Sequence, residues 1–208
     1  MRTNYLSDAD KLVLVKAMNE LSTAPLHIDD TPHLSVNQIT KVARRYKWQG
    51  NLGLIVIDYL GLIDPDNPTV PRQEQVSQIV RRLKRLAREL SVPVLCLAQL
   101  NRAVEATKDN RPRLSHLRES EAIEQVGDVV MFVHREEYYH KREEAEGMGI
   151  IGEAEIIIAK QRNGPIGDVK LAWISQFTLF ANLAETAPDE YGEFASFKPP
   201  SDDGGYGF

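Results

Sequence analysis

Four polar residues that suit phosphate or metal chemistry stand at the ends of apolar runs: Asp58, Gln99, Lys160 and Arg162. A carboxylate in such a position can hold Mg²⁺, usually through water, because Mg²⁺ prefers oxygen ligands and keeps its hydration shell. An amide can sense a phosphate or a water molecule, and arginine suits bidentate contact with phosphate. Each residue also has a structural interpretation.

Asp58 and Gln99 directly follow apolar runs that are typical of buried parallel strands. Many strands end in Asp only to cap a turn or a helix, and a Gln in this position can equally satisfy a backbone group. For either residue taken alone, the structural interpretation is favoured over the functional one.

Lys160 and Arg162 form a more specific pattern, in Lys160-Gln161-Arg162-Asn163-Gly164-Pro165. In a strand, residues i and i+2 point to the same face. Two cations side by side repel each other unless an anion lies between them. We therefore expect a phosphate partner, while an exposed hairpin with two solvated cations stays an open alternative.

Other motifs are excluded by their context. Residues 147–152 match G-x-G-x-x-G, but the dinucleotide motif needs a strand before it and a helix after it; here we expect a charged loop before it and a strand after it. The five histidines show no metal-ligand spacing with cysteines, and no nucleophile triad is recognisable. The single cysteine, Cys96, cannot form an internal disulfide, which suits a reducing cytoplasm, and we expect it to pack as a small hydrophobe.

The sequence predicts helices that alternate with apolar strands, and these elements must position the four residues. This alternation predicts an α/β doubly wound sheet. Ser7 and Ser35 are expected to cap the first two helices, and a third, amphipathic helix covers residues 72–88. Strands are expected at 26–29, 52–58, 93–98, 129–133, 153–160 and 168–174, with a short one near 177–180. Residues 114–125 include a short helical piece and 136–149 form a charged loop. Ligands of such sheets bind beyond the carboxyl ends of the strands.

The net charge of -5 arises from the C-terminal residues, because residues 185–208 hold six acids and one lysine. Residues 1–184 are expected to form the folded domain and 185–208 an acidic, disordered tail. Within 72–118, eleven Lys or Arg face four acids, which fits either a polyanion-facing surface or a solvated helix face. No apolar run reaches about 18 residues and the N-terminus is polar, so we expect no membrane span and a cytoplasmic location.

Taken together, several segments resemble the C-terminal motor domain of the DnaB family of hexameric replicative helicases. The segments are 25–32, 54–60, 92–100, 117–120, 123–125 and 157–165. They come in the family's order and cover about residues 5–184. The resemblance implies a RecA-like, mostly parallel sheet with a C-terminal antiparallel hairpin. It also implies ATP and Mg²⁺ as cofactors, with single-stranded DNA, a homo-hexamer, primase and a helicase loader as partners.

The same resemblance assigns roles to the residues of the nucleotide site. Asp58 resembles the Mg²⁺-associated acid of the second helicase motif, and Gln99 the residue that couples nucleotide state to the DNA loops. Lys160 and Arg162 resemble the pair that reaches a neighbouring subunit's γ-phosphate, with Arg162 as arginine finger.

The resemblance also implies a DNA-binding loop. Arg118, Glu119, Ser120 and Glu121 resemble the loop that lines the central channel and grips the backbone of single-stranded DNA. Glu121 stands where the family usually has Gly, and a carboxylate there repels DNA phosphate and makes a close backbone approach harder.

Further departures from the family qualify this interpretation. No G-x-x-x-x-G-K-[ST] sequence occurs; in the family that loop and a catalytic glutamate lie upstream of the matching region, so we expect the N-terminal part of the domain to be missing. We therefore expect no ATPase activity from this chain alone. Gly61 replaces the usual Gln. Open alternatives are a non-catalytic fragment that regulates or caps a helicase ring, another RecA-like DNA-dependent ATPase, or a plain single-stranded DNA binder.

Overall fold

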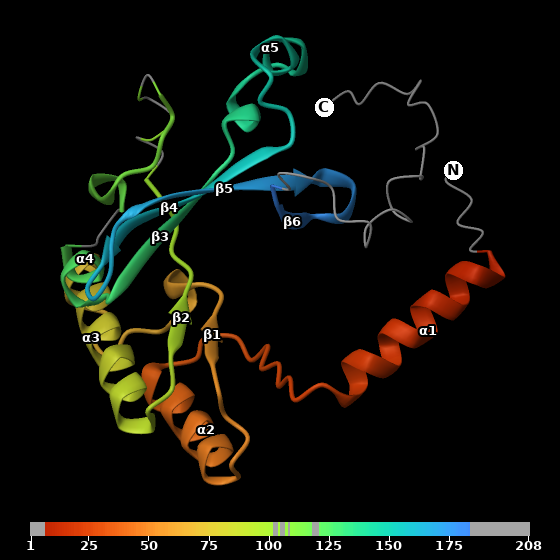
Figure 1. The fold of residues 1–208 in the computed structure, drawn as a ribbon. Coiled ribbons are helices and arrows are strands. Elements are labelled where there is room, and N and C mark those ends of the chain that lie inside the picture. The colour runs from red at the N-terminus through yellow and green to blue at the C-terminus, as the bar shows by residue number, and fades with distance from the viewer. Residues whose placement is uncertain (1–6, 102–103, 105–106, 108, 118–120, 184–208) are drawn as a thin grey trace. The chain divides into compact units, whose positions relative to one another are not determined.

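The computed structural model describes residues 7–101, 104, 107, 109–117 and 121–183. The chain divides into two compact units, one comprising residues 1–100 and 117–127 and the other residues 101–116 and 128–208 (Figure 1). Each unit has its own sheet, parallel in the first and antiparallel in the second.

The first unit contains two parallel strands and four α-helices. The strands are β1 (Ile55–Ile57) and β2 (Val94–Cys96), with Ile55 opposite Val94. The helices are α1 (Asp8–Thr23), α2 (Val36–Trp48), α3 (Arg72–Leu90) and α4 (Glu121–Val126), and a 3₁₀ turn, η1 (Leu60–Leu62), follows β1. Between β1 and β2 the chain passes through α3, the crossover that a parallel pair requires.

Side-chain caps and apolar stripes explain where α2 and α3 lie. Ser35 caps α2 by accepting the Gln38 N–H, and the Gln38 side chain accepts from the Ser35 N–H in return. α3 ends at Ser91, which adopts a left-handed conformation with φ 50°. The two helices bury their apolar faces against one side of the β1–β2 pair, in two clusters of buried residues. The first cluster consists of Val36, Leu60, Ile63, Val76, Ile79 and Leu83. The second consists of Ala43, Leu86, Leu90 and Val92.

The opposite side of the parallel pair is exposed in this chain. Val56 and Leu95 lie opposite each other in the register and both are about half exposed. α1 has no buried residue. Every helix in the described part of the chain is too short or too polar to cross a bilayer.

The second unit is built on a four-stranded antiparallel sheet in the order β3-β4-β5-β6. The strands are β3 (Val129–His134), β4 (Glu153–Gln161), β5 (Gly167–Ile174) and β6 (Leu179–Asn182). Short helical segments join or flank them: η3 (Leu114–His116), η4 (Glu136–Tyr139), α5 (Arg142–Met148) and η5 (Ser175–Phe177). Along β3, exposed and buried residues alternate strictly, so this strand has one covered face.

The α/β class is confirmed, and the expected helices and most of the expected strands are present. Among the described strands the parallel pairing is confined to β1 and β2, and the antiparallel part has four strands rather than a two-stranded hairpin. The strand expected at residues 26–29 is wrong, because this segment has no regular secondary structure. The expected tail, 185–208, lies outside the described residues.

The charged loop expected at residues 136–149 is also wrong, because this segment folds into η4 and α5. The Glu144 carboxylate accepts a hydrogen bond from the Lys141 N–H at the start of α5, and Arg142 pairs with Glu146 one turn on. Gly149 ends the helix with φ 71°, a conformation that glycine adopts without steric cost. The Gly147–Gly152 sequence therefore begins in the last turn of a helix and is followed by a strand, the reverse of the dinucleotide-binding order.

Candidate nucleotide and DNA site

Asp58 lies at the carboxyl edge of the parallel pair. It directly follows β1, and its side chain is exposed. The Leu97 N–H donates to the Ile57 carbonyl at 2.9 Å, and the Leu60 N–H donates to the Leu97 carbonyl at 2.8 Å. These bonds hold the chain segments leaving β1 and β2 side by side, at the edge where doubly wound sheets bind ligands.

Gln99 lies beyond the same edge of the parallel pair. It does not directly follow the strand as expected, because β2 ends at Cys96, three residues earlier. The Gln99 side chain is exposed. The next residue, Leu100, forms an isolated antiparallel bridge with Leu117. The backbone next to Gln99 is thus joined to the backbone that leads into residues 118–120.

The expected DNA-binding loop falls mostly outside the described part of the chain. Arg118, Glu119 and Ser120 are not described, and Glu121 is the first residue of α4. Their roles remain predictions from the resemblance.

Gly61, which stands in η1 where the family usually has Gln, lies against the side chain of Tyr59. A Cβ atom placed at Gly61 would collide with the ring of Tyr59. A longer side chain at position 61 would require this ring to move, so the ring occupies the space that a Gln would need. The Asp58–Tyr59 peptide bond is cis.

Lys160 and Arg162 lie where β4 ends, in the second unit. Lys160 is opposite Val130 in the register, and the Arg162 N–H donates to the Asp128 carbonyl at 2.8 Å. The Arg162 Nη1 atom is 3.7 Å from Asp128 Oδ1, and both side chains are about half exposed. Such an exposed pair contributes only about 0–1 kcal/mol.

A β-bulge decides which face of the sheet these cations occupy. The register changes from Ile158 opposite Met131 to Lys160 opposite Val130, so Ala159 is the extra residue. If the regular register continued through Ala159, Lys160 would lie opposite the exposed Val129 instead of the buried Val130. Bulges often re-aim a side chain near functional sites.

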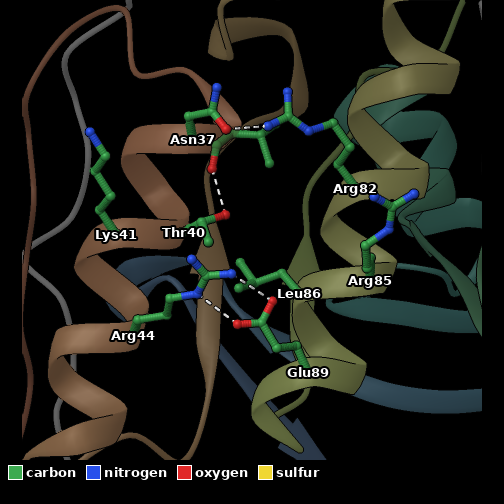
Figure 2. A pocket seen from close by; sticks show the side chains of 9 residues that line it. Asn37, Thr40, Lys41, Arg44, Arg82, Arg85, Leu86 and Glu89 are labelled. Atoms are coloured by element: carbon green, nitrogen blue, oxygen red, sulfur yellow. Dashed lines mark hydrogen bonds and ion pairs between the residues drawn. The ribbon is translucent and has the colours of Figure 1, made fainter.

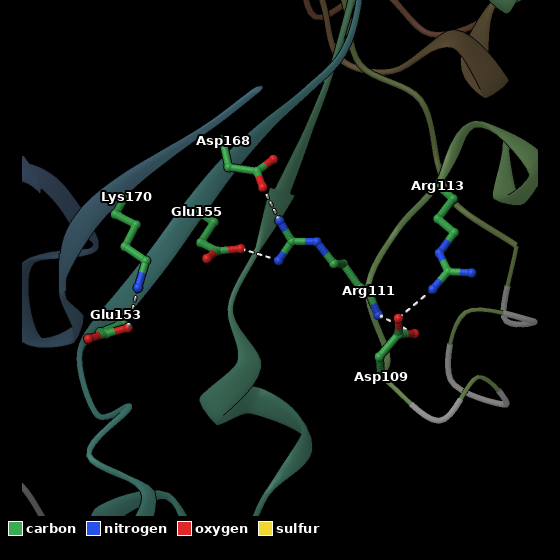
Figure 3. Close-up of polar contacts among 7 residues, drawn as sticks. All are labelled: Asp109, Arg111, Arg113, Glu153, Glu155, Asp168 and Lys170. Atoms are coloured by element: carbon green, nitrogen blue, oxygen red, sulfur yellow. Dashed lines mark hydrogen bonds and ion pairs between the residues drawn. The ribbon is translucent and has the colours of Figure 1, made fainter. Parts of the chain in front are cut away.

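Arg111 makes the central polar contact of the second unit, and no local pattern in the sequence points to it. Its guanidinium bonds to the Glu155 carboxylate on β4 and, at 2.6 Å, to Asp168 Oδ2 on β5 (Figure 3). Arg113 pairs with Asp109 in the same segment. The segment 109–113 is thus fastened to one face of the antiparallel sheet.

His134 and Glu137, two further ionisable groups of the second unit, have shifted pKa values. Burial lowers the pKa of His134, which is only 5% exposed, and the charge of Arg111 lowers it further. Partial burial tends to raise the pKa of Glu137, but the Gly152 N–H, at 2.8 Å, and Arg135 stabilise its carboxylate and lower the pKa overall.

Residues 1–182 match the family model described as the DnaB-like helicase C terminal domain. The chain belongs to this family. It is 50% identical over 184 residues to the replicative DNA helicase DnaB of Geobacillus stearothermophilus, covering 88% of this chain and 39% of the relative. It is 47% identical over 190 residues to the replicative DNA helicase DnaC of Bacillus subtilis, covering 91% and 41%.

Solved structures agree with this family assignment. One of them, a solved ATPase domain, matches with a TM-score of 0.81 and 41% identity, over 88% of this chain and 63% of that one. A DnaB-like replicative helicase, solved in a study of its interactions with primase, matches with a TM-score of 0.80 and 41% identity, over 88% and 43%. This chain of the DnaB family thus spans about two fifths of the length of the curated relatives it matches.

Asp58 fits a role at a magnesium ion, as far as the described residues go. Within them, no three His, Cys, Asp or Glu residues are grouped closely enough to hold a metal. Mg²⁺ at nucleotide sites commonly takes one or two carboxylates and completes its shell with water and phosphate oxygens. An exposed carboxylate at the carboxyl edge of a parallel pair is compatible with that arrangement.

Proposed function

We propose that this chain works within an ATP-dependent replicative DNA helicase, as part of a hexameric ring that translocates on single-stranded DNA and unwinds the duplex at the replication fork. The observation that carries the proposal is the family match over residues 1–182. The placement of Asp58 and Gln99 beyond the same edge of the β1–β2 pair supports it.

Within that proposal, Asp58 associates with Mg²⁺ through water, and Gln99 relays nucleotide state to residues 118–121. The Leu100–Leu117 bridge supports the relay, because a shift of the backbone after β2 would move the start of the DNA loop. Bound Mg²⁺ neutralises charge on the phosphates of ATP.

Lys160 and Arg162 are proposed to act on the nucleotide of a neighbouring subunit. Arg162 suits this role because its side chain is about half exposed. A cation so placed stabilises charge on the transferred phosphoryl group and is worth about 10³–10⁵ in rate.

The 208-residue chain alone is proposed not to hydrolyse ATP, since its sequence contains no G-x-x-x-x-G-K-[ST] motif to cradle the phosphates. Primase is a proposed partner of the whole helicase, because one matching helicase was solved in a study of its interactions with primase. A helicase loader is proposed from the family alone.

A mixed-ring experiment tests the proposal. The 208-residue chain is mixed with the intact Geobacillus stearothermophilus relative, and DNA-stimulated ATP hydrolysis is measured at increasing ratios. We expect the chain to enter the ring and to serve the neighbouring nucleotide site through Arg162. The Arg162→Ala chain should therefore lower the rate per ring more steeply than the unmodified chain.

Lys170→Ala provides the matched control, because Lys170 is an exposed cation of the same sheet that pairs with Glu153. It should behave as the unmodified chain does. Equal inhibition by the unmodified and the Arg162→Ala chains, at equal incorporation measured by mass, would favour a non-catalytic role in capping the ring. A chain that never enters rings contradicts the assembly part of the proposal.

A further inference from the structure

A polar groove runs between α2 and α3, on the helical layer of the first unit (Figure 2). It encloses about 380 Å³. Two of its lining residues, Val36 and Leu86, are almost fully buried and give it an apolar base. The other lining residues are Asn37, Thr40, Lys41, Arg44, Arg82, Arg85 and Glu89.

Two of the four cations in the groove are already neutralised. Arg44 makes a two-point contact with Glu89, with Nε 2.6 Å from Oε1 and Nη2 2.9 Å from Oε2. Arg82 bonds to Asn37 Oδ1 at 2.6 Å and pairs with Asp66. These contacts link the helices and fix the shape of the groove.

The other two cations, Lys41 on α2 and Arg85 on α3, have no acidic partner among the residues that the structure describes. Both side chains are exposed, and Figure 2 shows them on the two opposite walls of the groove. Figure 2 also shows the other labelled side chains between these two cations, so they would meet two different carboxylates of an extended segment rather than one anionic group. Arg85 offers a fork that matches a carboxylate, and Lys41 offers a point charge.

We propose that this groove binds an acidic peptide segment of a partner protein. Carboxylates of the segment pair with Lys41 and Arg85. A nucleic acid fits this groove less well, because single strands are held largely by stacking of their bases on aromatic side chains. Among the described residues, no aromatic side chain lines it.

The test uses the 208-residue chain and a short fluorescent peptide of alternating glutamate and leucine, with binding followed by anisotropy. The combined Lys41→Gln and Arg85→Gln variant should bind about tenfold or more weakly, the loss expected when two charge-assisted contacts disappear. The peptide with glutamine in place of glutamate should show no groove-dependent binding.

The matched control combines Lys47→Gln and Arg81→Gln, which remove the same charge from exposed positions of the same helices outside the groove lining. Its affinity should change by less than about twofold. Equal losses in the two double variants would overturn the proposal, because they indicate general charge attraction. A single-stranded oligonucleotide that binds more tightly than the peptide and depends on Lys41 and Arg85 would overturn it in favour of a nucleic-acid site.

Circular dichroism and thermal unfolding are used to check that both double variants fold. All four substituted side chains are exposed, so the fold should be unaffected. The peptide titration therefore reports on the groove alone.

Discussion

Arg162 and Asp128 are joined at the end of the β3–β4 ladder by two different contacts. The backbone bond from the Arg162 N–H to the Asp128 carbonyl is 2.8 Å long, and the side chains approach to 3.7 Å. The backbone bond positions the residue, while the exposed ion pair only biases the direction of its side chain. The two contacts can be separated experimentally, since a substitution at Asp128 removes the ion pair and keeps the backbone bond.

Asp128→Asn is expected to lower the rate of ATP hydrolysis in mixed rings only about two- to fivefold. This is the size of effect that an exposed pair of about 0–1 kcal/mol supports. Arg162→Ala should cost far more under the same conditions, because it removes the group proposed to meet the phosphate. The two rates are compared at matched incorporation into the ring. If Asp128→Asn were as harmful as Arg162→Ala, Asp128 would have a role beyond orienting the arginine.

Arg111→Ala is expected to destabilise the second unit by about 1–3 kcal/mol, because it removes charge-assisted bonds to two carboxylates and leaves Glu155 and Asp168 uncompensated. Arg111→Lys should recover part of this loss, since lysine keeps the charge but not the fork. The measurement is urea unfolding followed by the fluorescence of Trp173 in a Trp48→Phe background; Trp48 is 89% exposed, so this change should be harmless.

Arg142→Ala serves as the control for Arg111, because the Arg142 side chain is 85% exposed and pairs with Glu146 along the same helix, α5. It should change the free energy of unfolding by less than about 0.5 kcal/mol. Equal effects of the two substitutions would show that the Arg111 contacts do not stabilise the sheet.

Cys96 is expected to resist alkylation in the folded chain. Burial raises the pKa of its thiol from 9.0 to about 11, so at pH 8 very little of it is the reactive thiolate. Iodoacetamide labelling, followed by mass spectrometry, should be slow in buffer and fast in urea. Rapid labelling of the folded chain at pH 8 would show that the thiol is accessible and ionised.

Local patterns in the sequence predicted the elements with local causes. A serine cap and an apolar stripe predicted α2, and an apolar stripe alone predicted α3. A continuous apolar run predicted β1. α5 is not evident from its composition, because a run of charged residues is also typical of a solvated loop. The spacing of Arg142 and Glu146, which suits an ion pair along a helix, is the signal that points to it. The segment at 26–29 was too short for its apolar residues to decide its structure.

The contacts of Arg111 could not be predicted in this way. Its partners Glu155 and Asp168 are 44 and 57 residues away, and only the pairing of β4 with β5 brings them together. The same limit applies to the bulge at Ala159, which depends on the register with β3. The sequence therefore identified Lys160 and Arg162 as candidates, while their face is decided by a register that spacing alone does not reveal.

The stability of the second unit is expected to fall as the pH drops below about 6.5 because of His134. Burial and the nearby charge of Arg111 lower the pKa of this histidine from its ordinary value of 6.5. The unfolded chain therefore binds a proton at a pH where the folded chain does not, and protonation favours unfolding. Glu137, whose folded pKa is also lowered from 4.5, contributes its own loss of stability at lower pH.

His134→Asn separates these two effects. The substitution should lower stability at neutral pH, since His134 is buried, but it should flatten the dependence between about pH 6.5 and pH 5. The free energy of unfolding is measured across this range by the Trp173 assay, with His27→Asn in the first unit as the control that keeps the original slope. An unchanged slope in His134→Asn would mean that another group accounts for the acid sensitivity in this range.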